Sequence, residues 1–103
     1  MRRRFPLLAL ALLTLALAPT AAAVADVARG ERLANRCCAA CHLVSGTQTR
    51  ATPDAPSFAA IARRADAPPL EAFLAVSHTR MPDMALTRDE IADLSAYIRA
   101  SAP

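Results

Sequence analysis

The run Cys38-Ala39-Ala40-Cys41-His42 decides how the rest of this sequence is interpreted. Two thiols three positions apart lie on the same face of a helical turn, so both sulfurs point toward one side of the chain. A histidine follows the second thiol directly, which places an imidazole beside the pair. The run therefore presents two sulfurs and one nitrogen to a single partner.

This C-x-x-C-H spacing is the pattern of covalent haem attachment. Cys38 and Cys41 can each add to a vinyl group of the same porphyrin and form a thioether. His42 is then carried beneath the macrocycle, where one ring nitrogen binds iron as the proximal ligand. The run therefore predicts one covalently bound haem c.

Two other uses of the thiols, a redox-active pair and half of a zinc site, fit the sequence less well. A thioredoxin-like pair requires a βαβ pattern around it, which the sequence lacks. A zinc site needs two more ligands, and only Cys37 and His78 remain as soft donors. We interpret Cys37 as a small buried or idle side chain, although an unpaired thiol in an oxidising compartment can also link two chains.

The first 25 residues indicate a cleavable secretory signal peptide, which leaves 26–103 as one monohaem domain. Arginines occupy positions 2–4, an apolar run covers 7–18, and small residues lead to Ala25. This apolar run is shorter than the roughly 20 residues of a membrane span, so an uncleaved anchor is the lesser alternative. Adjacent arginines also resemble a signal for export of folded proteins, but haem is added after export. We expect the general secretory route and a periplasmic location.

Removal of 25 residues from the 103-residue chain leaves 78, a size at which an apolar core alone stabilises a domain only marginally. Phe58, Phe73 and Tyr97 are the only aromatic side chains in this part. A haem would complete the core, and we expect the domain to be largely unfolded without it. Nine arginines remain against nine acidic residues, a balance that gives no support for a nucleic-acid partner.

Helices and loops, with no alternating strand pattern, are expected after residue 26. Asp26 can cap a first helix that runs to Cys38, and Gly30 inside it indicates a close approach by another element. The apolar side chains expected on the buried side of this helix are Val27, Leu33 and Ala34. A loop without periodicity covers 43–57 and could wrap the haem edge.

Three further helices are expected. Ser57 can cap a short one with Phe58, Ile61 and Ala62 on one face, and another begins near Pro69 with Leu70, Phe73 and Leu74 facing the core. Thr87 and Glu90 fit a capping box for the last helix, which should end near Ala100. Its inward stripe is Ile91, Leu94 and Ile98, with Tyr97 beside it.

The sixth iron ligand is expected between the third and last helices, in the segment 78–84. Met81 is preferred, because Pro82 disfavours a helical conformation at the residue before it and so holds Met81 extended in a loop. His78 and Met84 are the alternatives. Methionine side chains also commonly fill hydrophobic cores, but a Met-Pro loop at this place in the chain favours iron ligation over core packing for Met81.

Taken together, these motifs resemble the small bacterial class I c-type cytochromes. The resemblance is carried, in the family's order and over the whole of 26–103, by Gly30, the C-x-x-C-H run, Pro56 in Ala55-Pro56-Ser57-Phe58, Met81-Pro82-Asp83 and the last helix with Tyr97. It implies an all-α cytochrome c fold of three to four short helices wrapped around one haem, with first and last helices crossing where Gly30 packs near Tyr97.

The resemblance also implies that a carbonyl near Pro56 accepts a hydrogen bond from the other nitrogen of His42, although Pro53 could do this instead. The sequence departs from the family's pattern in two respects. Cys37 stands beside a haem thiol, and the chain has no lysine, so a lysine ring for partner docking is not expected.

The function that follows is exported one-electron transfer with His/Met-ligated haem, by transient docking to a redox protein donor and acceptor, and not enzymatic catalysis. One alternative is a haem protein with a labile sixth ligand, either gas-binding or peroxidase-like. The other is a cytochrome subunit of a larger periplasmic oxidoreductase or oxidase, which would reach the membrane only through its partners.

Overall fold

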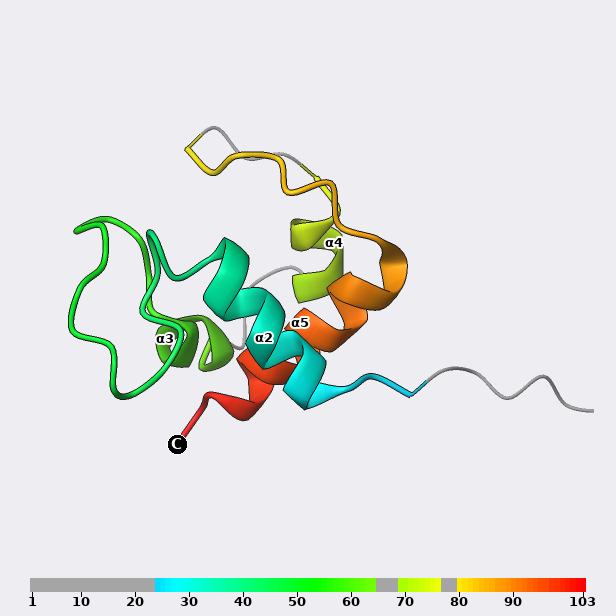
Figure 1. Ribbon diagram of the computed structural model, residues 1–103, viewed down its shortest axis with the longest axis horizontal. Coiled ribbons are helices and arrows are strands. Elements are labelled where there is room, and N and C mark those ends of the chain that lie inside the picture. Colours follow the sequence, from blue (N-terminus) through cyan, green and yellow to red (C-terminus); the bar gives the residue numbers. More distant parts are fainter. Residues whose placement is uncertain (1–23, 65–68, 77–79) are drawn as a thin grey trace, which may run out of the picture.

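The computed structural model describes residues 24–64, 69–76 and 80–103. Four helices lie in this part of the chain, which contains no β-sheet: α2 (Val27–Cys37), α3 (Phe58–Ala62), α4 (Leu70–Leu74) and α5 (Arg88–Ala100). Figure 1 shows α2 crossing α5, with α3 and α4 placed around this pair. The expected all-α class is confirmed. None of the helices in the described ranges has the length and apolar character needed to cross a membrane.

Helix α2 begins where the sequence predicts. The Asp26 side chain accepts a hydrogen bond from the Arg29 backbone N–H at 3.0 Å, and Leu33 and Ala34 are buried. The expectation that Val27 is also buried is wrong, since this side chain is 45% exposed. Val27 lies one turn before Gly30, the point at which α2 and α5 cross. Two helices that cross at an angle diverge on either side of the crossing, which leaves Val27 uncovered.

The crossing of α2 and α5 depends on Gly30. A Cβ atom added there would lie 2.8 Å from the Cβ of Tyr97 and still closer to the backbone carbonyl of Asp93. No side chain fits in this space, so the glycine allows the two backbones to meet. The predicted close approach, and its location beside Tyr97, are confirmed.

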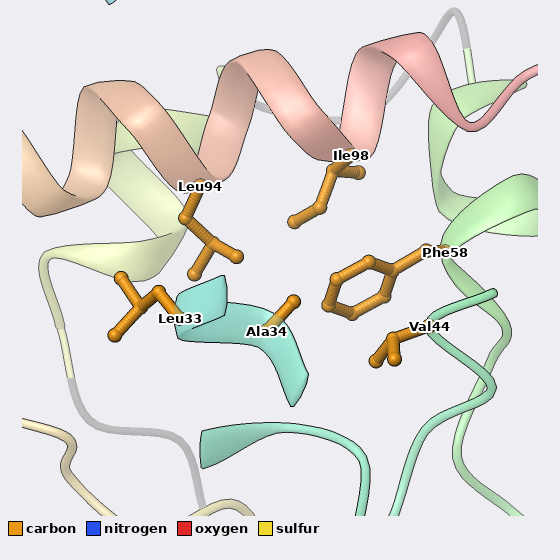
Figure 2. Close-up of a cluster of buried hydrophobic side chains, with 6 residues drawn as sticks. All are labelled: Leu33, Ala34, Val44, Phe58, Leu94 and Ile98. Atoms are coloured by element: carbon orange, nitrogen blue, oxygen red, sulfur yellow. The ribbon is translucent and has the colours of Figure 1, made fainter. Parts of the chain in front are cut away.

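The core combines side chains from three helices and one loop. Its six buried apolar members point toward one another in Figure 2: Leu33, Ala34, Val44, Phe58, Leu94 and Ile98. Phe58 also meets Tyr97 edge to face, with ring centroids 6.1 Å apart. Val44 belongs to a loop in which no core residue was expected, yet it is 1% exposed.

The short helices α3 and α4 differ in how deeply they pack. Ser57 caps α3 as predicted, accepting from the Ala60 N–H at 3.1 Å, and Phe58 is buried. In α4, Leu70 and Leu74 pack against the core, whereas Phe73 is 47% exposed, contrary to expectation. A helix of about one turn has one contact line, and here the i, i+4 leucines occupy it.

Helix α5 is formed as the sequence predicts. Thr87 and Glu90 exchange both hydrogen bonds of a capping box, at 2.9 and 3.2 Å, and the helix ends at Ala100. Leu94 and Ile98 are buried, while Ile91 is half-buried.

Candidate functional site

The two thiols of the C-x-x-C-H run lie on one turn at the carboxyl end of α2. The N–H groups of Cys41 and His42 both donate to the carbonyl oxygen of Cys38, at 3.1 and 2.9 Å. This turn brings the second thiol back beside the first and carries the imidazole out directly after it. Cys38 is half-buried against the core, and Cys41 is exposed.

The His42 ring is held by a backbone carbonyl. Its Nδ1 lies 2.7 Å from the carbonyl oxygen of Pro56, and its centroid lies 5.7 Å from that of Phe58. Because a carbonyl can only accept, Nδ1 carries the hydrogen, and in the neutral imidazole Nε2 is then the nitrogen with a free lone pair. Of the two prolines considered from the sequence, Pro56 is therefore the one whose carbonyl reaches the ring.

Backbone hydrogen bonds bring Pro56 to this position. The Thr52 N–H donates to the Cys41 carbonyl at 2.8 Å, and the Phe58 N–H donates to the Leu43 carbonyl at 2.9 Å. These bonds fold the 43–57 loop back onto the C-x-x-C-H turn. The carboxamide of Gln48, which was not predicted from the sequence to belong to the site, contacts the same turn through the carbonyl oxygens of Ala39 and His42.

The electrostatic surroundings of Cys38 favour an uncharged sulfur. Burial, with smaller contributions from the neighbouring Cys37 and Cys41, raises the pKa of the Cys38 thiol to about 11. An attacking thiol must be a thiolate, so this environment disfavours the redox-active use. Moreover, no three His, Cys, Asp or Glu side chains gather into a metal site within the described ranges.

Cys37, the thiol next to the predicted haem cysteine, is half-buried and packs against the core. None of the three cysteines forms a disulfide in the described part of the chain.

The described part of the segment with the candidate sixth ligands, residues 80–84, lies in an extended arc that leads to α5 (Figure 1). Met81 and Met84 are both half-buried in it. The Asp83 side chain accepts from the Ala85 N–H at 2.9 Å, and Ala85 has a positive φ of 48°, so Met84 lies within a tight turn whereas Met81 precedes it. His78, the third candidate, lies outside the described residues.

A charged cluster joins the start of α2 to α5 and was not predicted from the sequence. The carboxylate of Asp93, which is 5% exposed, accepts from the Asp26 N–H at 2.6 Å and from Arg29 Nε at 2.9 Å. These hydrogen bonds hold the pKa of Asp93 below its ordinary value despite burial, and the bond from the Asp26 N–H has the largest effect. The paired residues lie 64 and 67 positions apart in the sequence, and no local sequence pattern links positions so far apart.

These residues fit a covalent haem. A thioether sulfur is neutral, which is the state that the surroundings of Cys38 favour. The imidazole of His42 has one nitrogen committed to Pro56 and the other free of hydrogen bonds to any described residue, as a ligand to iron requires. The turn thus offers two sulfurs and one oriented nitrogen.

Comparisons with known proteins agree with this geometry. The model of the family described as Cytochrome c matches residues 27–102. A cytochrome c-552 of Bradyrhizobium diazoefficiens is 42% identical over 93 residues, which cover 88% of this chain and 89% of that protein. No solved structure matches the chain significantly. The chain therefore belongs to the cytochrome c family, and it is an electron-transfer protein with one covalently attached haem c.

Proposed function

We propose that this protein is an exported one-electron carrier in which Cys38 and Cys41 hold the haem by thioethers and His42 Nε2 binds iron. The observation that carries the proposal is the 2.7 Å contact between His42 Nδ1 and the Pro56 carbonyl, made beside a turn that presents both thiols. A histidine whose second nitrogen donates to a fixed carbonyl is oriented and made more basic as a metal ligand.

The haem supplies an iron that alternates between the ferric and ferrous states. The protein's part is to keep the surroundings of that iron unchanged as its charge changes. Pro56 fixes the ring of His42, and the α2–α5 core fixes the turn that bears both thiols. A frame that does not rearrange suits rapid transfer during brief docking with a donor and an acceptor.

Met81 is proposed as the sixth ligand. It is half-buried, it precedes a proline that favours an extended backbone, and it lies outside the Asp83 turn that contains Met84. A thioether ligand stabilises the ferrous form and raises the reduction potential. His42, with its ring held by the Pro56 carbonyl, and Met81 would then together bind the iron.

Replacing each methionine tests this assignment. Met81→Ala is expected to abolish the weak red absorption band of ferric sulfur-ligated haem and to let the ferrous protein bind carbon monoxide readily at neutral pH. Met84→Ala, the matched control, should retain the band and bind carbon monoxide as slowly as the wild type. The reverse pattern would show that the assignment is wrong, and ready binding by the wild type would favour a gas-binding or peroxidase-like protein.

Export is proposed from residues 1–25. The arginines at positions 2–4, the short apolar run and the small residues before Asp26 are the features that support a cleaved signal. Amino-terminal sequencing of protein from a periplasmic fraction is expected to begin at Asp26. Retention in the membrane fraction with Met1 intact would favour an uncleaved anchor.

A further inference from the structure

We propose that Gln48 is a positioning residue for His42, whose carboxamide fixes the backbone from which the imidazole is presented to iron. This inference rests on the proposed function of His42 and adds a residue to it. Gln48 lies six positions after His42, in the loop that returns from the C-x-x-C-H turn toward Pro56.

One side chain binds the backbone on both sides of the histidine. Gln48 Nε2 lies 2.8 Å from the carbonyl oxygen of His42 itself and 2.9 Å from that of Ala39, inside the C-x-x-C-H run. It also lies 2.9 Å from the carbonyl oxygen of Arg50. The Oε1 atom accepts from the N–H of Val44 at 3.0 Å. The carboxamide therefore spans the peptide backbone from 39 to 50.

The contacts leave only one orientation for the amide. Nε2 faces three carbonyl oxygens, and its two hydrogens serve them with one hydrogen shared. Exchanging Nε2 and Oε1 would set an oxygen against those three carbonyls and an NH₂ group against the N–H of Val44. No other side chain type of similar size offers both a donor pair and an acceptor in this geometry.

Gln48 also connects the histidine to α5. Its partner Val44 is 1% exposed, and the carbonyl of Val44 accepts from the Tyr97 hydroxyl at 2.5 Å. The backbone two residues after His42 is therefore held on its N–H side by Gln48 and on its carbonyl side by α5. Pro56 then fixes the ring, while Gln48 fixes the main chain that carries it.

Packing alone does not hold the outer part of this loop, residues 45–50. Gly46, Thr47 and Thr49 are exposed, and space is open around Gly46. A hollow of about 460 Å³ is lined by the loop residue Ser45 and by Tyr97 of α5. Because residues 46, 47 and 49 make so few apolar contacts, the hydrogen bonds of the carboxamide hold this outer part of the loop, in addition to the backbone bonds of Thr52 and Phe58.

The test compares haem-bearing wild-type protein with Gln48→Met, which has similar length without hydrogen bonds, and Gln48→Glu, which places a carboxylate oxygen against the carbonyls. Thr49→Ala is the matched control, because the Thr49 side chain makes no hydrogen bond to any described residue. The readout is the set of hyperfine-shifted proton resonances of the His42 imidazole and the haem methyl groups in the ferric protein. These resonances report the orientation of the axial ligand.

Both Gln48 variants are expected to take up haem and to show displaced His42 and haem-methyl resonances, while Thr49→Ala matches the wild type. Unchanged resonances in the Gln48 variants would overturn the inference, as would equal displacement in Thr49→Ala. Failure of both variants to take up haem would also overturn it, because Gln48 would then serve folding or attachment. Absence of His42 resonances from the wild type would instead contradict the proposed function.

Discussion

Asp93 retains a negative charge although it is 5% exposed, because two donors from the start of α2 compensate for its burial. Its lowered pKa makes the stability of the fold depend on pH. The carboxyl titrates near 3.9 in an unfolded chain and lower in the folded protein. The folded state therefore gains stability from this group above about pH 4 and loses it as the pH falls through the folded pKa.

Asp93→Asn tests this dependence. The amide oxygen can still accept from the Asp26 N–H, but the charge that attracts Arg29 is gone. We expect the variant to have a lower free energy of unfolding than the wild type at pH 7, and the difference to shrink below about pH 4. Guanidinium unfolding of both haem-bearing proteins between pH 7 and pH 2 measures it. A difference that stays constant over this range would contradict the assignment.

Ser95 of α5 and Ser101, the residue that follows the end of α5, are expected to respond in opposite ways to the same substitution. The hydroxyl of Ser95 is buried without a hydrogen-bond partner among the described residues, whereas that of Ser101 donates to the Tyr97 carbonyl at 3.0 Å. Ser95→Ala should raise the free energy of unfolding by about 1 kcal/mol, and Ser101→Ala should lower it by about 1 kcal/mol. Equal losses in denaturant unfolding would show that Ser95 is hydrogen-bonded.

At the scale of the helices, capping patterns within one turn predicted where helices begin, whereas tertiary packing determined which side chains of each helix are buried. Asp26, Ser57 and Thr87 were recognised as caps because a cap depends only on residues within one turn, and all three accept the expected hydrogen bonds. Val27 and Phe73 were wrongly expected in the core. Their exposure depends on where neighbouring helices diverge, which periodicity does not encode.

Gly30→Ala tests the helix crossing. The added methyl group would meet the Asp93 backbone and the Cβ of Tyr97, neither of which is the flexible end of a side chain. The two helices must then separate, and we expect a loss of about 1–3 kcal/mol in the free energy of unfolding. Gly46→Ala is the control, because space is open there. A stabilised Gly30→Ala variant, as helix propensity alone predicts, would contradict the close contact.

At the scale of the whole molecule, the sequence predicted the turn of Cys38, Cys41 and His42 more completely than the contacts that hold this turn and the helices in place. The spacing of the run fixes the turn itself, and family resemblance pointed to the Pro56 carbonyl. Gln48, Asp93 and the loop residue Val44 were not recognised. Each acts through contacts with distant or irregular backbone, for which a single sequence carries no periodic signal.

The account depends most on which side chains of this small domain carry the haem. Trypsin cleavage after Arg36 and Arg50 would release residues 37–50, which contain all three cysteines and His42. The digest should follow alkylation of protein from a host that attaches haem c, and tandem mass spectrometry should locate each modification. We predict one haem on this peptide, with the alkyl group on Cys37 and none on Cys38 or Cys41. A colourless protein of bare polypeptide mass, or an alkylated Cys38, would contradict the account.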